Sequence, residues 1–147
     1  AIGMNVARIA AAFGCEVLAY SRTKKEMDNV RYVSLDELMA ESDIISLHVP
    51  SNAETKGLIS AEKIALMKPN AVLINTARGP VLDSQALADA LNNDKIAGAC
   101  IDVFVNAKHT ILTPHVAFAS KEAMVKRAII VFDNVVKYLN GTPQNIM

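Results

Sequence analysis

Four side chains that can bind anions or move protons follow short apolar runs of this 147-residue sequence. They are His48, Arg78, Asp102 and His115. A guanidinium can hold an anion through two parallel hydrogen bonds, and an imidazole, whose ordinary pKa is about 6.5, can give and take a proton near neutrality. The set therefore suits the binding and protonation of an anionic molecule, whereas one such residue alone would be a common polar side chain on a protein surface.

The elements that must position these side chains are short apolar runs, most of them separated by amphipathic stretches. Several runs are rich in Val and Ile and do not alternate with polar residues, which is typical of strands covered on both faces. The predicted strands cover residues 16–20, 44–49, 71–75, 97–103 and 110–113.

Polar residues that commonly begin helices stand between these runs. Ser34 and Glu37 form a capping box, in which each side chain can satisfy the other's free amide. Strands that alternate with helices predict an α/β fold with a doubly wound parallel sheet, a three-layer αβα arrangement. The other predicted helices follow Ser60 (61–67), Asp83 (84–91) and Ser120 (to Leu139, with Gly141 as C-terminal cap).

Ligands of such a sheet bind beside the carboxyl ends of its strands, and five strands deliver polar residues to that edge. The glycine-rich loop Gly-x-Gly-x-x-Gly of dinucleotide sites is incomplete here. Gly3 fits only the third glycine, which allows close helix packing, and no strand precedes it. The polar residues at the edge are Ser21, Arg22, His48, Asn75 to Arg78, Asp102 and His115.

Composition narrows the classes of function. Basic and acidic residues balance to a formal charge of zero, so we expect neither a nucleic-acid nor a membrane-surface partner. No apolar run approaches the ~20 residues of a membrane span, and no export signal is evident. Cys15 and Cys100 lie far apart in apolar sequence, which favours a reduced, cytoplasmic protein. No metal site is predicted.

Three segments resemble motifs of the D-isomer-specific 2-hydroxyacid dehydrogenases. Residues 66–83 (LMKPNAVLINTARGPVLD) resemble the central motif of that family. Residues 43–50 (DIISLHVP), followed by 54–59 (ETKGLI), resemble the preceding motif, and 113–117 (TPHVA) resemble the motif with the catalytic histidine. The resemblance implies a Rossmann-type fold, with residues 1–147 as the dinucleotide-binding domain and the family's substrate domain largely absent.

The resemblance also implies roles for single residues. Arg78 would hold the substrate carboxylate, and His115 would be the general acid and base. Asp102 would face the nicotinamide amide of the cofactor. The other expected cofactor contacts are Gly3 as the last loop glycine, Ser21 and Arg22 near the adenosine ribose, Val49 and Pro50 at the adenine side, the backbone of Thr76 and Ala77, and His48.

The sequence departs from the family at the partner of the catalytic histidine. The family places a glutamate about five residues after the position of Asp102, and here that position is Ala107. Two parallel strands normally need a crossover of about a dozen residues. Only six residues separate Val103 from Thr110, too few for such a crossover to the strand predicted at 110–113, so we expect that residues are lacking near 103–109 and before Gly3.

A second departure concerns the choice between NAD and NADP. NAD-specific members have an acidic residue at the end of the second strand, where this sequence has Ser21 followed by Arg22. Thr23, Lys24 and Lys25 come next, so cations that could pair with a 2′-phosphate are present. A solvated basic turn is the alternative. The pattern predicts an NAD(P) cofactor and favours NADP.

The resemblance implies hydride transfer between NAD(P)H and a small 2-oxo or 2-hydroxy acid. Glyoxylate, hydroxypyruvate, pyruvate-like acids and phosphoglycerate are all compatible substrates, and the family also oxidises formate and phosphite. The alternative is a catalytically inactive dinucleotide-binding regulatory or scaffold protein of the same family. Ala107 favours that alternative, whereas Arg78 and His115 oppose it.

The family usually forms homodimers through this domain, so we expect a homodimer. The helix predicted at 120–139 carries a broad apolar stripe that would suit an interface. Packing within one chain explains the stripe equally well, and we expect it to be buried. Its residues are Ala123, Met124, Ala128, Val131, Val135 and Leu139.

Overall fold

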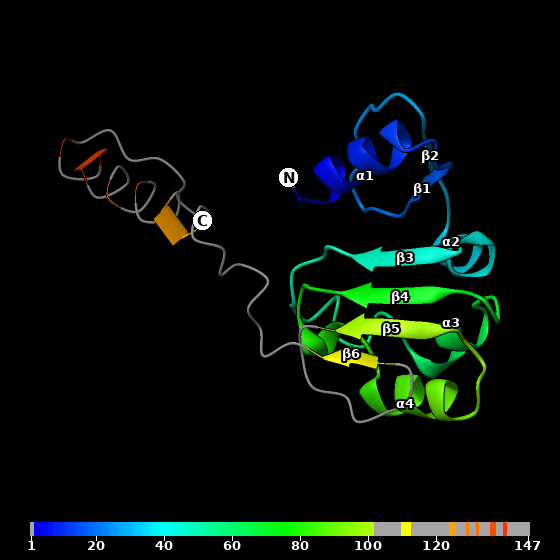
Figure 1. The fold of residues 1–147 in the computed structure, drawn as a ribbon. Coiled ribbons are helices and arrows are strands. Elements are labelled where there is room, and N and C mark those ends of the chain that lie inside the picture. Colours follow the sequence, from blue (N-terminus) through cyan, green and yellow to red (C-terminus); the bar gives the residue numbers. More distant parts are fainter. Residues whose placement is uncertain are drawn as a thin grey trace. The chain divides into compact units, whose positions relative to one another are not determined.

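The computed structural model describes residues 2–101 and 110–112, and in addition residues 124, 125, 129, 132, 136, 137 and 140. The chain forms two compact units, Ala1–Pro114 and His115–Met147. The sheets and the hydrophobic core belong to the first unit (Figure 1). Among the described residues, no helix has the length and apolarity that crossing a membrane requires.

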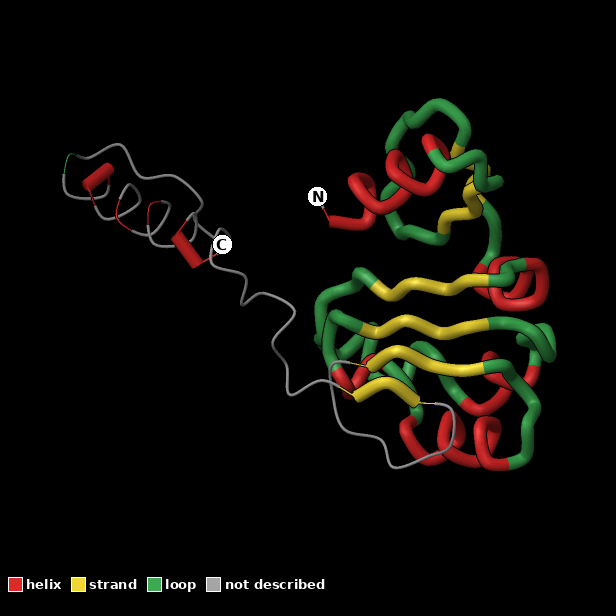
Figure 2. Tube along the Cα trace, in the orientation of Figure 1, coloured by secondary structure: helices red, strands yellow, loops and turns green. Residues whose placement is uncertain are grey.

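A four-stranded parallel sheet with the order β3-β4-β5-β6 is the centre of the first unit. Its strands are β3 (Ile44–Leu47), β4 (Val72–Asn75), β5 (Gly98–Ile101) and β6 (Thr110–Leu112). They lie side by side (Figure 2), and their arrowheads point toward one edge of the sheet (Figure 1). All four fall within apolar runs that the sequence predicted as strands.

A separate two-stranded parallel sheet pairs β1 (Val17–Ala19) with β2 (Val30–Tyr32). The strand at β1 was predicted, but β2 was not. Its three residues contain the exposed Arg31 between two half-buried residues, so β2 has no apolar run that would mark it. The predicted fold class, parallel sheets with flanking helices, is confirmed.

Five helical segments flank the sheets in the described part of the first unit. They are α1 (Ile2–Ala12), α2 (Leu35–Glu41), α3 (Ala61–Ala65), the 3-10 helix η1 (Gly79–Val81) and α4 (Ser84–Asn92). Ser34 Oγ accepts a hydrogen bond from the Glu37 amide, as the capping box predicted. Asp83 caps α4 by accepting from the Ala86 amide at 3.0 Å. Ser60 precedes α3 but makes no side-chain cap bond.

The hydrophobic core lies between the four-stranded sheet and α2, α3 and α4. Alternate strand residues such as Ile45, Leu47 and Leu73 are buried with Ile64 of α3 and Leu91 of α4. One face of the sheet is therefore buried more deeply than the other, where Ile44 is exposed. The core is aliphatic throughout: Met39, Ile45, Leu47, Ile59, Ile64, Met67, Ala71, Leu73, Val81, Leu82, Leu87, Ala88, Ala90, Leu91, Ile96, Ala99 and Ile101.

The argument that six residues after Val103 are too few to lead to another parallel strand is wrong. β6 pairs with β5 in parallel, with Thr110 opposite Ala99 and Leu112 opposite Ile101. From the end of β5 to the start of β6 the chain must go back about two residues along the strand direction, ~7 Å, and across one strand spacing of ~5 Å. A stretch of eight residues, the number between Ile101 and Thr110, can span up to ~25 Å, which exceeds the distance that this return requires.

Two helical segments expose apolar side chains. In α1, Ile2, Val6, Ile9 and Phe13 just after it are exposed, and none of its residues is fully buried. In the second unit, residues 124, 125, 129, 132, 136 and 137 are helical.

The expectation that the stripe of the second helix is buried is wrong at Met124, which is exposed. The other stripe residues, Ala123, Ala128, Val131, Val135 and Leu139, lie outside the described residues.

The cap of α4 gives a first testable prediction. Replacement of Asp83 by Ala leaves the Ala86 amide without its acceptor and should lower the free energy of unfolding by about 1 kcal/mol. Ser60→Ala is the matched control, because Ser60 makes no cap bond, and should cost less than about 0.5 kcal/mol. Urea unfolding of both variants tests this, and equal losses would contradict the role of Asp83.

Candidate functional site at the carboxyl edge of the sheet

The register of the parallel sheet aligns the carboxyl ends of β3, β4 and β5. Leu47 pairs with Asn75, and Asn75 pairs with Ile101. His48 and Thr76 therefore follow neighbouring strands at equivalent positions. The sequence placed both residues at one edge, and the observed register agrees with that placement.

Gly3 in the first turn of α1 lies against His48. A Cβ atom built on Gly3 would stand 3.3 Å from His48 Cβ and 3.5 Å from His48 Cδ2. That separation is tighter than ordinary van der Waals contact, so a side chain at position 3 would require His48 to shift by a few tenths of an ångström. Gly3 thus allows the close helix packing that the third glycine of a dinucleotide loop provides.

His48 is half-buried at the end of β3. Its Nε2 lies 2.9 Å from Ser46 Oγ, within hydrogen-bonding distance. Burial lowers the pKa of His48, because the charged imidazolium loses water that the neutral ring needs less. The neutral ring is therefore the favoured form at pH 7. Val49 is half-buried and Pro50 is exposed directly after it.

Asn75 shapes the turn that follows β4. Its side chain is fully buried; Oδ1 accepts from the Ala77 amide at 3.0 Å and Nδ2 donates to the Arg78 carbonyl at 3.1 Å. The carboxamide thus holds the backbone of two residues of the turn 75–78. Thr76 and Arg78 are exposed at this turn, and the Arg78 guanidinium also donates to the Ala77 carbonyl at 2.8 Å.

The segment after β3 is bonded to the segment after Arg78. The Gly57 amide donates to the Pro80 carbonyl at 2.9 Å, and the Ile59 amide donates to the Val81 carbonyl at 3.0 Å. The Asp83 amide donates back to the Ile59 carbonyl at 2.9 Å. Gly57 adopts a positive φ of 65°, which glycine tolerates without strain. The loops after β3 and β4 are therefore one connected backbone framework.

Arg22, after β1, forms an ion pair with Glu54, after β3. The sequence singled out Arg22 and the absence of an acid at Ser21, but it missed Glu54. The two residues are 32 positions apart, and only the fold brings them together. A carboxylate therefore does lie beside the basic turn that follows β1, although the adjacent sequence contains none at the expected position.

Two predicted site residues, Asp102 and His115, lie outside the described residues. Asp102 follows Ile101, the last residue of β5. The predicted site residues that the structure describes therefore lie in α1 and in the loops that follow β1, β3 and β4. Within these residues, no group of three or more His, Cys, Asp or Glu side chains could hold a metal ion.

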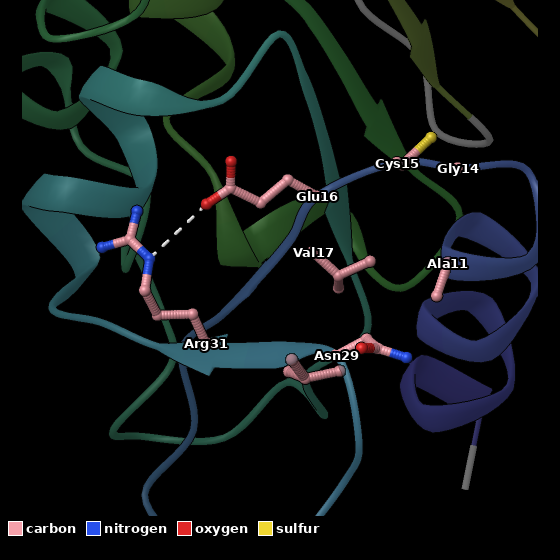
Figure 3. A pocket seen from close by; sticks show the side chains of 8 residues that line it. Ala11, Gly14, Cys15, Glu16, Val17, Asn29 and Arg31 are labelled. Carbon is pink, nitrogen blue, oxygen red and sulfur yellow. Dashed lines mark ion pairs between the residues drawn. The ribbon is translucent and has the colours of Figure 1, made fainter.

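A hollow of about 670 Å³ lies elsewhere, at the amino ends of β1 and β2 (Figure 3). Arg31 crosses it toward Glu16 at 3.7 Å and also pairs with Glu37 and Glu41 of α2. Glu41, and to a smaller extent Glu37, raise the pKa of Arg31. None of the predicted site residues lines this hollow.

The sequence of residues 1–117 matches the model of the D-isomer specific 2-hydroxyacid dehydrogenase NAD binding domain. The chain belongs to this family. It is 40% identical to a hydroxypyruvate reductase of Blautia hydrogenotrophica, over 99% of this chain and 50% of that protein. It is equally similar, at 40%, to a glyoxylate reductase of Thermococcus litoralis, over 99% of this chain and 49% of that protein.

Solved structures show the same fold. An acyclic imino acid reductase in complex with NADPH and D-Arg superposes with a TM-score of 0.93 at 39% identity, over 99% of this chain and 50% of that chain. The chain spans about half the length of the relatives that it matches.

The burial of His48 predicts a pH dependence of stability. Its pKa is lower in the folded protein than the unfolded value near 6.5, so between these two values the unfolded chain binds more protons. Stability should therefore fall as the pH falls below about 6.5. His48→Asn should make the melting temperature less dependent on pH between 7 and 5, as thermal unfolding would show. An unchanged pH profile would contradict this assignment.

Proposed function

We propose that the chain is the dinucleotide-binding part of a reductase that transfers hydride from NAD(P)H to a small 2-oxo acid. The observation that carries the proposal is the turn after β4, where buried Asn75 holds the backbone of Ala77 and Arg78 at the carboxyl edge of the sheet. The names of the relatives, a hydroxypyruvate reductase and a glyoxylate reductase, support 2-oxo acids as the substrate class.

The close approach of Gly3 to His48 fits a dinucleotide-binding domain, in which the third glycine of the loop allows close packing of the helix. When bound, the nicotinamide supplies or accepts the hydride. The residues proposed to hold the cofactor are Gly3, Ser21, Arg22, His48, Val49, Pro50, Thr76, Ala77 and Asp102.

Arg78 is proposed to bind the substrate carboxylate. Its guanidinium is exposed and, beyond the bond to the Ala77 carbonyl, has further N–H groups that can match two carboxylate oxygens. That bidentate contact would fix the orientation of the 2-oxo carbon. His115 is proposed to donate the proton that the carbonyl oxygen needs as it gains negative charge, and to remove it in the reverse direction.

We further propose that NADP is preferred over NAD. Arg22 and the lysines that follow it offer positive charge to a 2′-phosphate, and position 21 has no acid to repel one. The NADPH in the structurally similar imino acid reductase is compatible with this preference. Titration with both reduced cofactors tests it, and equal or tighter binding of NADH would contradict it.

A homodimer is also proposed. The exposed apolar residues of α1, among them Ile9 and Phe13, support an interface there. Sedimentation at micromolar protein concentration tests this, and a monomer would refute it.

The role of Arg78 predicts the behaviour of a conservative variant. Arg78→Lys keeps the charge but loses the planar fork, so kcat/KM for the best 2-oxo acid should fall at least about tenfold. A steady-state assay over glyoxylate, hydroxypyruvate and pyruvate with NADPH, with and without ammonia to reveal imine reduction, measures the effect. Arg31→Lys, at the other end of the strands, is the matched control and should leave kcat/KM unchanged.

The same assay separates the enzyme from a binding-only scaffold. A scaffold would bind NADPH without oxidising it in the presence of any 2-oxo acid. Turnover by wild type together with equal loss in the Arg78 and Arg31 variants would contradict the role of Arg78 while leaving the reductase assignment in place.

A further inference from the structure

The ion pair between Arg22 and Glu54 joins the loops that follow two different parallel strands, β1 and β3. Both strands end near the edge proposed to bind the dinucleotide. Within the described residues, Glu54 is the ion-pair partner of Arg22. The cation proposed to meet the adenosine ribose is therefore already engaged by a carboxylate of the same protein.

Backbone and side-chain hydrogen bonds fix the position of Glu54. Asn52 Oδ1 accepts from the amides of Glu54 and Thr55, at 3.0 and 3.1 Å. The buried Thr55 hydroxyl donates to the Pro50 carbonyl at 2.5 Å and accepts from the Asn52 amide at 2.9 Å. Gly57 is bonded in turn to Pro80. These hydrogen bonds thus fix the backbone of the loop that carries Glu54.

We propose that Glu54 is a specificity-determining residue, which occupies Arg22 and so limits the preference of the site for NADP over NAD. The inference rests on the proposed function. A 2′-phosphate that approaches Arg22 must share the guanidinium with Glu54 and meets its negative charge. A ribose with a free 2′-hydroxyl instead offers a hydrogen-bond donor, which a carboxylate accepts.

The exposure of the pair determines how large the effect should be. The side chains of Arg22 and Glu54 are 66% and 65% exposed, so solvent screens their interaction and a ligand can reach both. Removal of the carboxylate should therefore change the ratio of NADPH to NADH affinity by about two- to fivefold. The gain should shrink as the ionic strength rises.

The experiment is a set of equilibrium titrations with NADPH and NADH on wild type and four variants. Glu54→Gln should raise the affinity for NADPH and leave the affinity for NADH unchanged or weaker. Glu26→Gln is the matched control, because it removes one negative charge from the exposed loop that contains Arg22. Arg22→Ala and the double variant Arg22→Ala/Glu54→Gln complete a thermodynamic cycle.

The outcomes separate this proposal from the proposed function. The proposal predicts that Glu54→Gln shifts the affinity ratio more in the wild-type background than in the Arg22→Ala background, because only the competition for the guanidinium requires Arg22. An unchanged ratio, an equal gain in Glu26→Gln, or a gain of the same size without Arg22 would overturn it while cofactor binding stands. A wild-type protein that binds neither NADPH nor NADH would overturn the proposed function, and this inference with it.

Discussion

The parallel register of β3, β4 and β5 is the constraint on which the rest of the first unit depends. With Leu47 opposite Asn75 and Asn75 opposite Ile101, three strands end at one level. A shift of one residue would turn the buried Leu47 and Leu73 away from α3 and α4 and would bring Asn75 out of the core. Burial of the aliphatic face therefore fixes the position of every loop at the carboxyl edge.

Asn75 fixes the shape of the turn that follows β4 at this edge. A fully buried carboxamide is costly unless its polar atoms are paired, and here both are bonded to the turn that contains Ala77 and Arg78. The bonds between residues 57–59 and 80–83 then tie this turn to the loop after β3. The site is thus held by backbone hydrogen bonds, while its exposed charges, Arg22, Glu54 and Arg78, remain available to a ligand.

The sequence predicted the elements with strong local signals. Apolar runs predicted β3, β4 and β5, and cap residues predicted α2 and α4, because burial and capping each depend on residues that are close together in the sequence. It missed β2, whose three residues include exposed Arg31, and it missed Glu54, whose relation to Arg22 arises only from the fold. The short connection before β6 led to a wrong expectation, because few residues are enough to return from the end of β5 to the start of a parallel strand of only three residues.

The central claim is that the dinucleotide binds at the carboxyl edge of the parallel strands. Amide chemical shifts of the isotopically labelled protein, recorded during titration with NADPH, test it most directly. The account predicts that the amides of Gly3, Thr76 and Ala77 shift on binding, whereas those of Glu16 and Val30 at the amino ends of β1 and β2 do not. Shifts confined to the residues around Arg31 would contradict it.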